Sequence, residues 1–167
     1  MTRSVLFASA LCAAATTFAQ ISVADIDPFI GTGGHGHTHP SATAPFGMVQ
    51  IGPDTRREGW DGCSGYHYSD TTVWGFSHTH LSGTGVGDYG DFLVKPWGQA
   101  FHDAPVAFKK SSESASAGYY GVTLADGTRA EFTAAERGGY HRYRFGQGQP
   151  AIAWIDLNYR DRVLRAK

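Results

Sequence analysis

Glycine and proline interrupt the first hundred residues of this chain so often that a long helix has no room to form there. The 167-residue sequence contains 22 glycines, concentrated between residues 31 and 98. Proline inside a helix removes a hydrogen bond and clashes with the preceding turn, and prolines occur at Pro28, Pro40, Pro45, Pro53 and Pro96. Short apolar runs at 48–51 and 92–94 lie between these residues, which is typical of short strands joined by long loops.

The second half predicts strands more directly. Residues 119–124 and 129–133 flank the dipeptide Asp126-Gly127, a favoured hairpin turn. Residues 140–145 alternate aromatic and charged side chains, as in a strand with one wet face. Residues 151–157 are almost continuously apolar and predict a strand buried on both faces.

No stretch shows a sustained helical period, so we expect an all-β fold, an antiparallel β-sandwich. The length suits one domain. Because so many residues lie in loops and the chain stops ten residues after the last predicted strand, we interpret residues 20–167 as the start of a longer protein.

Residues 1–19 have the features of a signal peptide. Arg3 provides a positive charge, residues 5–15 are apolar but too short to span a bilayer, and small residues Thr17 and Ala19 flank Phe18 before the expected cleavage point. We therefore expect an exported protein, periplasmic or extracellular, without a membrane span. The net charge of −1 argues against nucleic acid or an anionic membrane as a partner.

Cleavage would remove Cys12 and leave Cys63 as the one cysteine, so an intrachain disulfide is not expected. A single thiol can be a nucleophile or a packed, unreactive side chain. The absence of a neighbouring basic residue in the sequence favours the packed alternative.

Two glycine-rich stretches carry histidines spaced two apart: His35, His37 and His39, then His78 and His80. Imidazoles on one side of an extended segment can bind zinc or copper, but the glycines allow other conformations. A phosphate-binding loop is a weaker alternative, because neither stretch is followed by the lysine and hydroxyl residue of a P-loop.

The third alternative is a sugar pocket, because rings, imidazoles and acids are dense in these loops. Sugars need flat apolar surfaces for their C–H faces and donors and acceptors for their hydroxyls. The aromatic and histidine residues are Trp60, Tyr66, His67, Tyr68, Trp74, Phe76, His78, His80 and Tyr89, and the charged residues are Asp54, Arg56, Asp61, Asp70, Asp88 and Asp91. Any one of these rings could instead belong to the core.

Several long, ordered motifs resemble the opening of glycoside hydrolase family 92, a family of exported α-mannosidases. The matching segments are 23–40, 44–56, 59–70, 75–85, 88–91, 118–120 and 133–143. The resemblance implies an N-terminal β-sandwich packed against a helical (α/α)6 catalytic domain. It also implies a calcium-dependent, inverting exo-α-mannosidase that acts on mannose-containing glycans, as in N-glycan processing, with α-1,2 linkages expected.

In an inverting glycosidase one carboxylic acid protonates the leaving oxygen and a second carboxylate activates water. The resemblance places both carboxylates and most Ca2+ ligands in the helical domain, so we expect no catalytic residue and no metal site in this chain. It assigns Trp60 to the leaving-sugar side of the pocket, with Arg56, Asp61, His78 and His80 as candidate pocket or interface residues.

Our hypothesis is an N-terminal domain that contributes loops to a mannoside pocket at the interface with the catalytic domain and is inactive alone. The alternatives are a stand-alone carbohydrate-binding module and a periplasmic metal-binding protein.

Overall fold

The computed structural model describes residues 21–83, 85–87, 89–97 and 102–160. The predicted signal peptide therefore lies outside the described residues. Within the described residues there are only strands and three short 3-10 helices: η1 (Val23–Asp25), β1 (Ala42–Thr43), β2 (Gln50–Asp54), η2 (Trp60–Gly62), β3 (Thr72–Val73), β4 (Gly75–Ser77), β5 (Leu93–Lys95), β6 (Val106–Ala107), η3 (Lys110–Ser112), β7 (Ser114–Ser116), β8 (Tyr119–Thr123), β9 (Arg129–Ala135), β10 (Gly138–Arg144) and β11 (Trp154–Asp156). The expectation of an all-β, antiparallel fold is confirmed.

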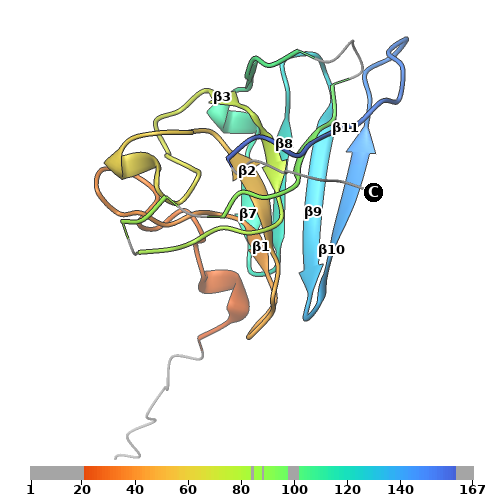
Figure 1. Ribbon diagram of the computed structural model, residues 1–167. Coiled ribbons are helices and arrows are strands. Elements are labelled where there is room, and N and C mark those ends of the chain that lie inside the picture. Colours follow the sequence, from red (N-terminus) through yellow and green to blue (C-terminus); the bar gives the residue numbers. More distant parts are fainter. Residues whose placement is uncertain (1–20, 84, 88, 98–101, 161–167) are drawn as a thin grey trace, which may run out of the picture.

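Two sheets face each other and form the sandwich (Figure 1). One has five strands in the order β1-β2-β4-β5-β11, and the other has four in the order β10-β9-β8-β7. All pairings are antiparallel. Strands β3 and β6 form a separate two-stranded ladder. The expected β-sandwich is therefore present.

The core lies between the sheets and draws apolar side chains from both. Phe76 of β4 meets Phe132 of β9 with ring centroids 4.6 Å apart. Ile51 of β2 and Tyr120 of β8 are fully buried in the same cluster. Apolar surface removed from water on both sheets is the main driving force for this packing.

The predicted hairpin is confirmed, with β8 and β9 joined through Asp126-Gly127. Gly127 has φ of +88° and donates its backbone N–H to Leu124 O at 3.0 Å. A side chain in that backbone conformation would be strained, which explains the glycine. The predicted alternating strand at 140–145 is β10, with His141 and Tyr143 on the core side and Tyr140 outward.

The prediction of a buried strand over residues 151–157 is wrong. Only Trp154–Asp156 forms a strand, and the side chain of Ile155 is 66% exposed. Among the described residues β11 pairs only with β5 and forms the edge of its sheet. An apolar run cannot by itself distinguish an edge strand from a central one, because pairing partners are set by the rest of the fold.

Candidate functional site

The two glycine-rich histidine stretches lie next to each other in space and enclose the turn that carries Trp60. Gly83 donates its backbone N–H to His37 O at 2.7 Å, and Ser64 Oγ donates to Thr38 O at 3.0 Å. The first stretch is a tight loop, because a Cβ on Gly36 would lie 1.8 Å from Gly31 O. Its His37 has φ of +56°, so the segment is not extended.

Trp60 begins η2 and presents a largely solvent-exposed indole, 64% exposed. The ring of His37 packs edge-on against it, with centroids 4.9 Å apart and planes at 82°. Gly85 lies against the indole so closely that a Cβ there would be 2.4 Å from Cη2. The indole is thus supported by backbone and imidazole while most of its surface faces water.

Asp61 follows Trp60 and bonds two of the three histidines of the first stretch. Its Oδ1 accepts hydrogen bonds from His35 Nδ1 at 2.7 Å and His37 Nε2 at 3.2 Å. The hydrogen bond from His35 is the main reason that the pKa of Asp61 lies below its usual value. The side chain of His35 is 83% exposed, whereas that of His37 is 8% exposed. Trp60, Asp61, His35 and His37 are called the Trp60 site below.

Arg56 lies outside the Trp60 site and forms a two-pronged ion pair with Asp70. Its Nη2 donates to Asp70 Oδ1 at 2.7 Å and its Nε to Asp70 Oδ2 at 3.1 Å. This hydrogen bonding raises the pKa of Arg56. Thr55 Oγ1 also donates to Asp70 at 2.9 Å. The pair fixes the loop before Trp60, and an open hollow of about 440 Å³ lies beside Arg56.

His78 connects the two sheets instead of pointing to the Trp60 site. Its Nε2 is 2.9 Å from Nε2 of His141, and its Nδ1 is 3.3 Å from Phe92 O. His141 Nδ1 in turn bonds the hydroxyl of Tyr143. The carbonyl of Phe92 can only accept, so His78 donates to it through Nδ1–H. If both rings are neutral, His78 Nε2 then accepts from His141 Nε2–H, and His141 Nδ1 accepts from the hydroxyl of Tyr143.

His80 is buried, 5% exposed, beneath the same loops. Its Nδ1 donates to Gln50 O at 2.8 Å, and its Nε2 lies 3.4 Å from Oδ2 of the fully buried Asp54. Ser77 Oγ is 3.3 Å from the same nitrogen. These contacts hold the end of β4 against β2.

The histidines of the two stretches diverge. His35 and His37 bond Asp61, whereas His39 lies beside His80 with ring centroids 5.0 Å apart and ring planes at 36°. Within the part of the chain that the structure describes, no group of three or more His, Cys, Asp or Glu side chains could hold a metal ion. The described residues thus do not fit the calcium site that the family implies. Cys63 is buried and unpaired, consistent with the packed alternative.

From the sequence, His35 and His37 are considered as metal ligands, but the candidate pocket residues do not include them. Their role depends on Asp61, which lies more than twenty residues away. His141 was also missed, because its pairing with His78 crosses from one sheet to the other. No spacing rule in the sequence indicates either contact.

Two buried histidines predict a loss of stability in acid. Burial, and secondarily the neighbouring His80, lowers the pKa of His39 to about 3; burial, and secondarily His78, lowers the pKa of His141 to about 4. Because the unfolded values are near 6.5, the unfolded chain takes up protons first as the pH falls. The stabilisation is complete above pH 6.5 and is lost below it, by at most about 1.4 kcal/mol per pH unit for each histidine.

Urea denaturation at pH 7, 6 and 5 checks this prediction. The urea midpoint of the wild type should decrease as the pH is lowered from 7 to 5. The midpoint of the variant H39Q/H141Q should change less over the same range, although this variant is less stable than the wild type at pH 7. A wild-type midpoint that stays constant from pH 7 to pH 5 would contradict it.

The fold is an antiparallel β-sandwich with ring-rich, polar loops, and comparison with known proteins gives its family. Residues 25–166 match the glycosyl hydrolase family 92 N-terminal domain. The chain belongs to this family.

Relatives of known structure share the fold. A family GH92 α-mannosidase from Bacteroides thetaiotaomicron has 39% sequence identity and a TM-score of 0.78 over 82% of this chain and 20% of its own. The same protein in complex with mannoimidazole aligns with a TM-score of 0.74. An uncharacterized secreted glycosidase from Arthroderma benhamiae is 30% identical over 79% of this chain and 19% of its own. The chain therefore spans about a fifth of the length of these relatives. No helix of the described part is long and apolar enough to cross a membrane.

Proposed function

We propose that this chain forms one wall of the mannoside pocket of an exported α-mannosidase, with terminal α-1,2-linked mannose as the substrate. The observation that carries the proposal is the Trp60 site: an exposed indole, braced by Gly85 and His37, beside a carboxylate that holds two imidazoles. The solved relative in complex with mannoimidazole supports a mannose-like ligand.

The chemistry of the Trp60 site suits a sugar. The indole offers a flat apolar surface for the C–H face of a pyranose, and its edges are already fixed, so little freedom is lost on binding. The exposed imidazole of His35 and the carboxylate of Asp61 provide donors and acceptors for hydroxyl groups. Because Asp61 also orients both histidines, it would set the position of these groups relative to the indole.

The other candidate residues would act around this contact. Three contacts hold the loops in place: Arg56 with Asp70, His78 with His141, and His80 with Asp54. We propose that they shape the pocket and its interface with the (α/α)6 catalytic domain. In the whole enzyme that domain would supply the acid, the base and most of the Ca2+ ligands.

Trp60→Ala tests the proposal directly. Titration of the chain with α-1,2-mannobiose should give a saturable change in tryptophan fluorescence, and the variant should lose it, because the contacting ring is gone. The matched control is Trp154→Phe, which removes an indole on the edge strand β11 and should leave the titration intact. A wild-type chain with no saturable change, or a Trp60→Ala variant that titrates normally, would refute the role of the Trp60 site.

A stand-alone carbohydrate-binding module is the second candidate, because Gly85 and His37 of this chain already brace the indole of Trp60, and Asp61 already bonds two imidazoles. The two candidate functions predict different activities for a longer protein that contains this chain and a helical domain. We expect the 167-residue chain to release no mannose from α-1,2-mannobiose with or without Ca2+. A longer chain carrying a helical domain should release it, whereas for a module the appended sequence would be inactive.

Export is tested separately, by sequencing the N-terminus of protein recovered from the periplasm or medium. We expect it to begin at Gln20. Recovery of a chain that retains Met1 in the cytoplasm would contradict the proposed signal peptide.

A further inference from the structure

The outer face of the four-stranded sheet carries a second group of polar and aromatic side chains. Along β9 the side chains alternate: Ala130 and Phe132 enter the core, while Glu131 and Thr133 point to the other face. The register places partners from β8 and β10 on both sides of each outward residue. None of the residues of the Trp60 site belongs to this face.

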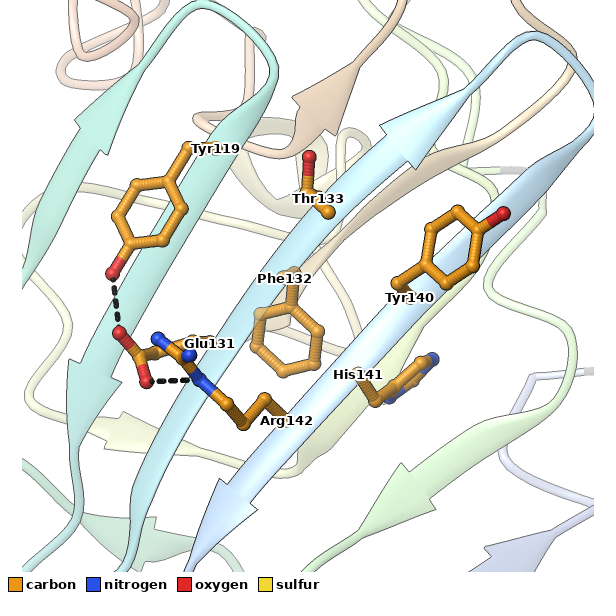
Figure 2. A pocket seen from close by; sticks show the side chains of 7 residues that line it. All are labelled: Tyr119, Glu131, Phe132, Thr133, Tyr140, His141 and Arg142. Carbon is orange, nitrogen blue, oxygen red and sulfur yellow. Dashed lines mark hydrogen bonds and ion pairs between the residues drawn. The ribbon is translucent and has the colours of Figure 1, made fainter.

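The first cross-strand row is aromatic. Thr133 pairs with Tyr119 on one side and with Tyr140 on the other. Because threonine is small, the two rings stand as walls on either side of it, with a hollow of about 260 Å³ lined also by Glu131 and Arg142 (Figure 2). Tyr140 is 64% exposed and has a ring face open to a ligand.

The second row holds a charged group beside this hollow. Glu131 Oε2 accepts from Arg142 Nε at 2.9 Å and from Arg144 Nη2 at 3.0 Å, and its Oε1 accepts from the Tyr119 hydroxyl at 2.9 Å. Gly121 lies opposite Glu131, and a Cβ there would be 2.6 Å from the Tyr119 hydroxyl. The missing side chain lets Tyr119 lean across the sheet to reach the carboxylate.

Positive charge exceeds negative charge on this face. Arg142 and Arg144 bond the carboxylate of Glu131, and Arg129 donates to the hydroxyl of Tyr119 beside it. Arg129 and Arg144 are directly opposite each other in the β9–β10 register, an arrangement of like charges that costs stability. The side chains of Arg142 and Arg144 are 65% and 62% exposed, so their remaining N–H groups face water.

We propose that this outer face binds an acidic saccharide residue. The pyranose ring would lie over Thr133 against Tyr140, and its carboxylate would accept hydrogen bonds from the guanidinium groups of Arg142 and Arg144. Charge-assisted bonds from guanidinium to carboxylate are among the strongest polar contacts in proteins, and a bound anion would offset the opposed arginines. The open tyrosine ring favours a saccharide over a free anion, because a free anion gains nothing from it.

Isothermal titration calorimetry of the full chain with methyl α-mannopyranosiduronate tests this site. We expect saturable binding, at least about tenfold tighter than for neutral methyl α-mannopyranoside or for acetate, since each lacks one of the two recognised features. Tyr140→Ala and Arg142→Gln should each weaken uronate binding about tenfold. Far-UV circular dichroism should show that both variants remain folded.

Two control variants make the result specific. Arg137→Gln removes an exposed arginine at the β9–β10 turn and should leave uronate binding unchanged. Repeating the comparison in the Trp60→Ala background removes any binding of the uronate or of the neutral mannoside at the Trp60 site, so the outer face is tested by itself. The proposal is overturned if, in the Trp60→Ala background, the uronate shows no saturable binding, the neutral sugar or acetate binds with equal affinity, or Tyr140→Ala and Arg142→Gln have no effect.

Discussion

Replacement of Phe132 by alanine should remove about 3–5 kcal/mol from the free energy of unfolding, the usual range for a buried phenylalanine. Its ring is 1% exposed and stands between the sheets, with centroids 4.6 Å from Phe76 and 5.1 Å from His141. The variant loses the transfer energy of the ring and leaves a cavity between two layers that cannot both move inward. Natural domains are stable by only about 5–15 kcal/mol, so a large share of the stability would be lost.

Urea denaturation followed by circular dichroism measures this effect. Phe132→Leu should cost much less, because it retains most of the volume. Phe46→Ala is the matched control, since Phe46 is fully exposed and its loss should change the midpoint little. A loss below about 1 kcal/mol for Phe132→Ala would show that the sheets do not depend on this ring.

Glu113→Gln should cost about 3 kcal/mol, the lower end for breaking a buried ion pair. The carboxylate of Glu113 is 2% exposed. Its Oε1 accepts from Tyr66 at 3.0 Å and Tyr120 at 2.7 Å, and its Oε2 accepts from Lys110 Nζ at 2.7 Å. An amide cannot accept at both positions, so an NH2 group would face a donor, and the ammonium of Lys110 would lose its counter-ion.

The same carboxylate affects the two tyrosines. Burial raises the pKa of Tyr66 and of Tyr120, and the charge of Glu113 raises both further.

The control for Glu113→Gln is Glu136→Gln, which removes the same charge from an exposed position and should change the unfolding free energy little. If Glu113→Gln and Glu136→Gln had equal unfolding free energies, the buried network would not contribute to stability.

The fold could be predicted to the extent that it depends on local pattern. The Asp126-Gly127 turn and the alternation of residues 140–145 indicated β8, β9 and β10 because turn geometry and side-chain period are properties of neighbouring residues. The edge position of β11 could not be predicted, because it depends on which strands pair. The loop between β2 and β3 illustrates the same limit: sequence indicated its rings and charges but not that Arg56 bonds Asp70.

The sequence indicates which residue types gather in these loops, but it does not indicate which of them make contact. His35 and His37 do lie beside Trp60 and Asp61, whereas His39 lies beside His80. Tertiary packing decides which rings are exposed and which are buried: Trp60 lies at the surface, whereas His80 and Tyr66 are buried. Burial of a polar ring is decided by available hydrogen-bond partners, and those came from distant segments.

The hydrogen-bonded series from Phe92 through His78 and His141 to Tyr143 has a consequence for how the layers align. Contact between aromatic side chains such as Phe76 and Phe132 depends weakly on direction, so two apolar faces could slide by a residue at modest cost. The hydrogen bond from His141 to His78, with the two Nε2 atoms 2.9 Å apart, is lost on such a displacement. It therefore favours one alignment of the two layers.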